Sequence, residues 1–289
     1  MTPALPPAVL AAVAALSALA QPSRVLEAYP GRTPVIDGVL ATGEWGDASR
    51  FLGVEGWVSE FTPVRDPRDL SLRGFVKHDG ERLYFAFDVT DDVLYGIGTE
   101  RWLPGNNPRA HELTREGFPW FGDGIEILIN APNRWRNEEG AAGDGSSWQM
   151  VCNLTKSRLG GVGKGGLLEG EPRRDPRAWE TYRRWILEGA QQAAALPKRD
   201  GRGYVIEWSI RFNPCLEVEP GVFYSPALGD RAAGLNIAVQ DLDEKQRGAG
   251  NFGNFHHEEW FAGAKGVRTR LRHFGTLWLR ASARPDSAR

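Results

Sequence analysis

Segments in which apolar and polar residues alternate make up much of the chain after residue 80. They cover residues 83–90, 125–129, 148–155, 204–212 and 235–240, and a last apolar run, FGTLWLR, covers 274–280. A period of two places successive side chains on opposite faces, so each segment predicts a β-strand with one buried face. Turn-forming Asp-Gly and Pro-Gly pairs lie between the segments. The pattern predicts an all-β fold, a single β-sandwich of two antiparallel sheets with long loops.

Residues of one parity within these segments form the predicted core: Phe85, Phe87, Ile125, Ile127, Ile206, Trp208, Ile237 and Val239. Two polar stretches, 96–119 and 157–177, interrupt the pattern and are predicted to be long loops of the kind that often carry function. Residues 178–196 combine helical propensity with an interrupting glycine, and their structure is left open. We predict one domain over residues 33–280 and a disordered tail over 281–289.

The first 20 residues carry no charge, are mostly small and apolar, and end in Ala18-Leu19-Ala20. This pattern predicts a signal peptide over residues 1–20, and hence an exported protein, whether periplasmic, secreted or at the cell surface. The alternative, a membrane anchor, is disfavoured because the run is short and contains prolines. No later segment is apolar enough to span a membrane, and the net charge of -2 gives no indication of a nucleic-acid partner.

The segment FPWFGDGIEILIN, residues 118–130, contains the most informative candidate chemistry. Its isoleucines share one strand face, Glu126 lies on the other, and Trp120 precedes the strand. An indole ring beside fixed hydrogen-bonding groups suits a sugar, whose C–H faces pack on the ring while its hydroxyls bond to carboxylates and amides. The alternative is a tryptophan that only covers the core.

Four amide side chains share the non-core parity of Glu126 on their own predicted strands: Gln149, Asn153, Asn236 and Gln240. If the strands are neighbours, one sheet carries a polar face rich in amides, which favours a binding site. The alternative is an ordinary solvated face, as antiparallel sheets commonly have. Eleven tryptophans in one chain also favour a site, because each indole N–H needs a hydrogen-bond partner that a core rarely supplies.

An ordered set of segments resembles family 9 carbohydrate-binding modules, the non-catalytic domains of bacterial xylanases. The segments are TPVIDGVLATGEWGDA, VKHDGERLYFAFDVTDD, PWFGDGIEILINAPN, SSWQMVCNLT, GYVIEWSIRF, GLNIAVQDLDE and HFGTLWLR. They span roughly residues 33–280, and the first of them looks like the opening strand of the family. The resemblance implies a β-sandwich that binds an oligo- or polysaccharide, and a partnership with glycoside hydrolases.

In that family two tryptophans clamp a terminal sugar. The resemblance places the clamp at Trp120 and Trp260, the acidic partner at Glu126, and the amide on the next strand at Asn153, with Gln149 near it. The sugar-binding arginine of the family corresponds here to Val151, which cannot donate a hydrogen bond, so the ligand preference is expected to differ.

Calcium is the one cofactor that the chain suggests. Asp88, Asp91 and Asp92 end a predicted strand and could hold a structural Ca²⁺ with loop carbonyls, and the resemblance includes calcium-bearing members. The alternative is a solvated turn. Cys152 and Cys215, the only cysteines, could pair in an exported protein or remain buried thiols.

Three other classes of function are less consistent with the sequence. Asp123 and Glu126 lie three residues apart on one strand, so they point to opposite faces and do not form a glycosidase pair. A haem-binding electron-transfer sandwich would need Met150 together with His256 or His257 as ligands. A structural or interaction domain at the cell surface needs no ligand at all. Catalysis is not expected.

Overall fold

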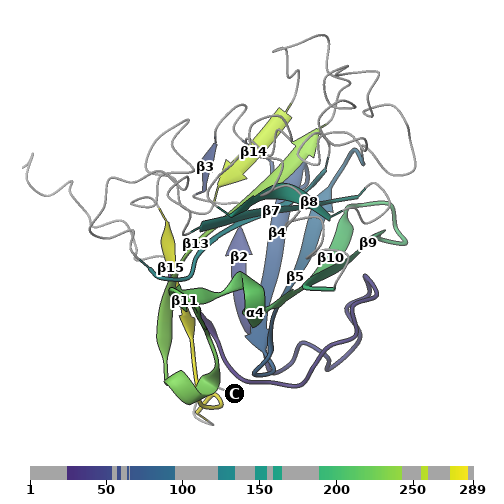
Figure 1. Ribbon diagram of the computed structural model, residues 1–289. Coiled ribbons are helices and arrows are strands. Elements are labelled where there is room, and N and C mark those ends of the chain that lie inside the picture. The colour runs from purple at the N-terminus through teal and green to yellow at the C-terminus, as the bar shows by residue number, and fades with distance from the viewer. Residues whose placement is uncertain are drawn as a thin grey trace, which may run out of the picture.

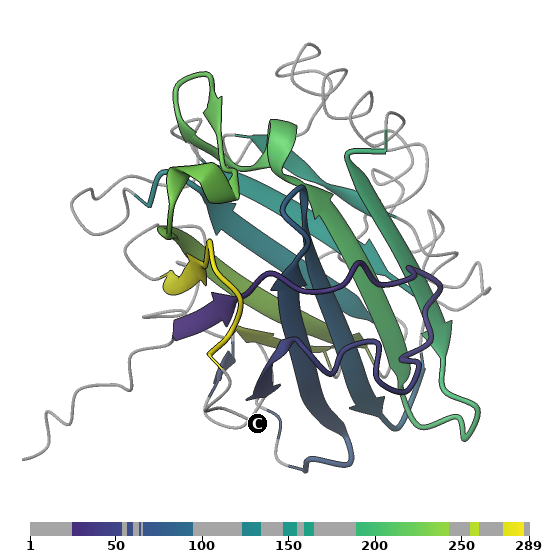
Figure 2. The same ribbon diagram turned by 90° about the horizontal axis from the view of Figure 1, so that it is seen from below.

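The computed structural model describes residues 25–53, 57–59, 64, 66–94, 123–133, 147–154, 159–164, 189–242, 255–259 and 274–285. These residues form a β-sandwich of two main sheets that lie face to face (Figures 1 and 2). All strand pairs are antiparallel except that of the first strand with the last. The predicted all-β sandwich is confirmed. Within the described ranges no helix is both long and apolar enough to cross a membrane.

The first sheet has eight strands: β1 (Val25–Ala28), β15 (Gly275–Leu279), β13 (Arg231–Leu242), β6 (Gly124–Asn130), β7 (Ser147–Asn153) and β8 (Leu159–Lys164) in that spatial order, with β14 (Phe255–Glu259) paired to β13 and β3 (Val58–Ser59) paired to β14. The second sheet has the order β2 (Ser49–Gly53), β4 (Leu70–His78), β5 (Arg82–Asp91), β10 (Tyr204–Arg211) and β9 (Gln191–Pro197). A small pair, β11 (Glu217–Glu219) and β12 (Val222–Phe223), and two short helical turns, α4 (Phe212–Cys215) and η5 (Pro226–Leu228), follow β10.

The space between the two sheets is filled by the residues that the alternating pattern selected. All eight predicted core residues are fully buried and belong to one hydrophobic cluster. Ile125, Ile127 and Ile129 of β6 face this cluster together with Met150 and Cys152 of β7. The strand register inferred from parity is therefore confirmed, because a slip of one residue would have turned every one of these side chains outward.

The segment expected to form an opening strand is instead a chain of turns. Residues 31–48 contain no strand, and they cross the outer face of the second sheet, as the purple trace in Figure 2 shows. Their backbone N–H groups bond to carboxylates in place of a strand ladder: Asp37 and Gly38 donate to Glu207 of β10 at 3.0 and 2.9 Å. Trp45 donates its indole N–H to the same carboxylate at 2.8 Å.

Trp45 anchors a second, smaller hydrophobic cluster on that outer face, with Phe75, Tyr84 and Ala86 beneath it. The ammonium of Lys77 lies 5.1 Å from the centroid of the Trp45 ring and bonds to Asp47 at 2.8 Å. Burial raises the pKa of Asp47, but hydrogen bonds from Lys77 and from the Arg32 N–H outweigh burial and leave that pKa below its ordinary value. The segment is thus held by apolar contact and by buried charge together.

The stretch left open by the sequence contains β9, which covers Gln191–Pro197 and forms the edge of the second sheet. The positive φ of Gly189, 71°, precedes this strand. The cysteines are both free and buried, Cys152 in β7 and Cys215 in α4. Burial raises the pKa of Cys215 to about 12 and that of Cys152 further, so neither is a reactive thiolate.

The first and the last of the described strands, β1 and β15, lie side by side. β1 runs parallel to β15, with Val25 beside Thr276 and Ala28 beside Leu279. Directly after β15, the N–H of Arg280 donates to the Ala28 carbonyl at 2.9 Å, and its guanidinium pairs with Glu27 of β1 and, at 2.7 Å, with Asp230. Backbone bonds and a charge cluster therefore join the first strand to the last.

Candidate functional site

The strands that carry the predicted polar positions are neighbours. β6 lies between β7 and β13, and the register forms three rows across them. One row aligns Asn153, Gly124 and Gln240; the next aligns Val151, Glu126 and Ala238; the third aligns Gln149, Leu128 and Asn236. β14 extends the first two rows with His257 and Glu259. Amide and carboxylate positions are thus gathered on one face of the eight-stranded sheet.

This face is not a solvated surface at the described positions. Glu126, Asn236 and Gln240 are at most 1% exposed, and Leu128 and Ala238 are fully buried. The Gln240 amide nitrogen donates to Glu126 at 3.1 Å, and the Ile237 N–H donates to the Asn236 amide oxygen at 3.0 Å. Because these positions are buried, they do not form the ordinary solvated face. A buried polar cluster is costly unless its groups form hydrogen bonds.

Gln240 presents an unused acceptor on this face. Its amide oxygen is buried, and within the part of the chain that the structure describes it accepts no hydrogen bond. Because its amide nitrogen is committed to Glu126, the orientation of the group is fixed. A hydroxyl group of a ligand is a suitable donor for such an oxygen.

The remaining predicted site residues are described only in part. For Gln149 and Asn153 the structure gives the position in β7 but not the side chain, and both positions lie in the polar rows. Trp120 and Trp260 lie outside the described residues. In the sequence Trp260 directly follows the last residue of β14, and Trp120 shortly precedes β6.

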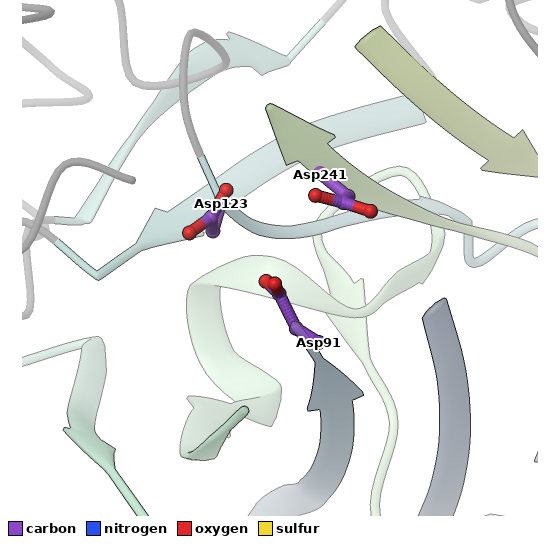
Figure 3. Close-up of side chains that lie close together, drawn as sticks. All are labelled: Asp91, Asp123 and Asp241. Carbon is purple, nitrogen blue, oxygen red and sulfur yellow. The ribbon is translucent and has the colours of Figure 1, made fainter. Parts of the chain in front are cut away.

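A second cluster, which the sequence did not reveal, lies at one end of the core. Asp91, Asp123 and Asp241 are buried, and each offers a carboxylate oxygen within 4.8 Å of the others. Figure 3 shows the three side chains pointing toward one another from three separate elements. Asp91 ends β5 of the second sheet, whereas Asp123 precedes β6 and Asp241 lies in β13 of the first. We call these three residues the aspartate cluster.

The structure separates the three acids that the sequence suggested for calcium. Only Asp91 of the three belongs to the aspartate cluster. Asp88 lies on the outer face of β5 and pairs with Arg73 and, at 2.6 Å, with Lys198, while Asp92 is exposed. Successive positions of a strand point to opposite faces, which is why three acids close together in sequence are separated in space.

The rejected glycosidase pair is separated as expected, since Asp123 belongs to the aspartate cluster and Glu126 bonds to Gln240 on the other face. Met150, the methionine of the haem hypothesis, is fully buried among aliphatic core residues and lies in register with Ile127. The side chains of His256 and His257 fall outside the description, which gives only their backbone in β14.

Comparison with solved structures identifies the class of fold. The chain is similar to a family 9 carbohydrate-binding module from Caldicellulosiruptor kristjanssonii in complex with cellotriose, with a TM-score of 0.54 and 14% identity over 92% of this chain and 97% of that one. A structure of such a module from the same organism in complex with glucose gives 0.54 and 13%, over 91% and 98%. No family model and no curated protein sequence matches. The chain therefore has a fold like that of family 9 carbohydrate-binding modules.

Proposed function

We propose that this protein is exported and that it binds the end of an oligo- or polysaccharide without catalysing its cleavage. The observation that carries the proposal is the pair of buried polar residues on neighbouring strands, Glu126 of β6 and Gln240 of β13, which leaves the Gln240 oxygen as an acceptor. A fold shared with modules whose complexes contain cellotriose and glucose supports it. Trp120 and Trp260 would stack on the sugar, and Glu126, Gln149 and Asn153 would bond to its hydroxyls.

The strand order supports a role for both tryptophans. β13 separates β6 from β14, so the strand ends next to Trp120 and Trp260 in the sequence flank the same polar rows. Val151, aligned with Glu126, provides no hydrogen-bond donor from its side chain. We therefore propose a ligand held by stacking and by few hydrogen bonds, with a dissociation constant of roughly micromolar to millimolar. A glycoside hydrolase system is the proposed setting.

Replacement of Trp120 by alanine should lower the affinity for such a sugar about tenfold or more, because loss of a stacking contact removes about 1.5 kcal/mol. The melting temperature should stay nearly unchanged. Isothermal titration with cellotriose and glucose, followed by a glycan array, measures the first quantity, and thermal unfolding measures the second.

Trp278→Ala provides the matched control, since Trp278 lies on β15, half-buried, with the Arg280 guanidinium 4.9 Å from its ring centroid. Its loss should leave sugar affinity unchanged. Unfolding of the Trp120→Ala variant would show that Trp120 is a core residue. If that variant differs from wild type in neither stability nor binding to any glycan, the protein is a structural or interaction domain.

A further inference from the structure

Two arginines lie directly opposite each other at one end of the outer face of the five-stranded sheet. Arg82 begins β5 and Arg211 ends β10, and the strand register pairs them. Both share the outward parity of the pair that follows, Tyr84 and Ser209, and Tyr84 belongs to the hydrophobic cluster of that outer face. Like charges at opposite positions of an antiparallel pair repel each other, so this end of the sheet is destabilised unless a negative charge lies near it.

The effects on neighbouring groups show that the two guanidiniums are close together. Burial lowers the pKa of Arg82, and the charge of Arg211 lowers it as well. Cys215 lies in α4, the turn that directly follows Arg211. Burial raises the pKa of Cys215, and the charges of both arginines oppose that rise. Two positive charges are thus concentrated at one place on the outer face.

No carboxylate within the described ranges forms an ion pair with either arginine. Arg82 is half-buried, and its guanidinium donates to neutral oxygens, the Ser209 hydroxyl and, at 2.7 Å, the Gly189 carbonyl. Asp79, in the turn before β5, acts on this guanidinium through its charge. Its two oxygens, however, accept from the Tyr84 hydroxyl and from backbone N–H groups. The positive charges are therefore left without a bonded anion.

Further hydrogen-bond donors lie beside the two arginines. Ser209 is 1% exposed, and its hydroxyl accepts from Arg82 but donates to no acceptor among the described residues. Gln192 of β9 lies opposite Ser209 in the register and is exposed, as is Arg211. Three adjacent strands thus bring together guanidinium, hydroxyl and amide N–H groups. An oxyanion is the ligand that suits such a set of donors with a net positive charge.

We infer that Arg82 and Arg211 bind an oxyanion, a carboxylate, phosphate or sulfate group, with the Ser209 hydroxyl and the Gln192 amide as further donors. The planar guanidinium presents paired N–H groups that match two oxygens of such a group. Exposed Arg211 gives access from solvent, whereas Arg82 is held in place by Ser209 and Gly189. The site belongs to the five-stranded sheet, not to the polar rows of β6, β7 and β13, so it does not depend on carbohydrate binding.

The test titrates the ¹⁵N-labelled full chain with sodium phosphate and, in parallel, with sodium glucuronate, at an ionic strength held constant with NaCl. We expect saturable changes in the amide signals of Gly189, Ser209 and Arg211, with a dissociation constant in the millimolar range or below. Binding of phosphate alone would assign the site to phosphate or sulfate groups, and binding of glucuronate alone would assign it to carboxylates; either result supports the inference. Absence of a saturable change with both ions would overturn it.

Arg211→Gln should weaken this binding about tenfold or more, because charge-assisted hydrogen bonds are lost. Arg202→Gln is the matched control, since Arg202 is an exposed arginine in the turn before β10, at the opposite end of that strand. It changes the net charge equally and should leave the binding intact. Equal weakening by the two substitutions would show that only net charge attracts the ion, and the inference would fail. If Arg211→Gln does not fold, Arg211→Lys replaces it and should also weaken binding, because lysine lacks the paired N–H groups.

Discussion

Replacing Glu207 by leucine should reduce the free energy of unfolding by roughly 3–5 kcal/mol. The substitution leaves three donors without their acceptor, and each buried donor in that state costs about 1–3 kcal/mol. The carboxylate of Glu207 is fully buried and accepts from the Trp45 indole and from the N–H groups of Asp37 and Gly38. Its neighbours in register are Ala86 and Ala194, whose small side chains leave room for it. Denaturant unfolding followed by tryptophan fluorescence would measure the loss.

Glu207→Gln is the matched control, since it keeps an acceptor oxygen and should cost less than the leucine variant. The pH dependence gives a further check. Burial raises the pKa of Glu207, although its three donors oppose the rise. The folded state thus holds this proton more tightly than the unfolded chain, and the stability that Glu207 provides falls as the pH rises through the raised pKa. The difference between wild type and Glu207→Leu should be larger at acidic than at neutral pH; equal costs for both substitutions would contradict the role assigned to the carboxylate.

Gly203→Ala should destabilise the fold by roughly 2–5 kcal/mol, the sum of a left-handed backbone penalty of about 1–2 kcal/mol and an overpacking cost of about 1–3 kcal/mol. Gly203 has a φ of 98°, and a Cβ there would lie 2.0 Å from the Val89 carbonyl oxygen and 2.9 Å from the Thr90 Cα. These are backbone atoms of β5, which cannot rotate away as a side chain can. The β9–β10 hairpin would have to move off its neighbour, and thermal and denaturant unfolding would register the change.

Gly201→Ala separates the backbone penalty from the overpacking cost. Gly201 lies in the same hairpin loop with a φ of 72°, but no atom lies within 4 Å of the position of its added Cβ. It should therefore show only the backbone penalty of about 1–2 kcal/mol. A Gly201→Ala variant as unstable as Gly203→Ala would mean that the close approach to β5 contributes nothing.

The alternating segments predicted the core correctly because burial on one strand face imposes a period of two on the sequence. Phe85, Ile127 and Trp208 were placed by this rule alone, and so were the polar positions Glu126 and Gln240. Strand order was beyond the same rule, since pairing joins residues far apart in sequence: Gln240 lies beside Gly124 and, through it, Asn153.

The aspartate cluster was missed for a related reason. Asp91, Asp123 and Asp241 come from three distant segments, and a search for acids close together in sequence selected Asp88 and Asp92 instead. A usable signal was present, because each of the three continues the apolar parity of its strand. In an all-β sequence, acids in core-facing positions at the ends of different strands can therefore indicate residues that lie close together in the fold. The segment 33–48, which resembled an opening strand, was misassigned because its hydrogen bonds go to side-chain carboxylates such as Glu207, which no local pattern reveals.

The parallel pairing of β1 with β15 has a mechanical consequence. Tension applied between the two ends of the domain would slide these strands along each other, so that their hydrogen bonds share the load instead of breaking one at a time. The Arg280 guanidinium, held by Glu27 and Asp230, would add resistance at the same place. Burial raises the pKa of Glu27, but hydrogen bonds from Arg280 and Tyr29 outweigh burial and leave that pKa below its ordinary value. The ion pair between Arg280 and Glu27 should therefore weaken only in acid. Single-molecule pulling from the two ends should accordingly give a high rupture force that Arg280→Ala reduces.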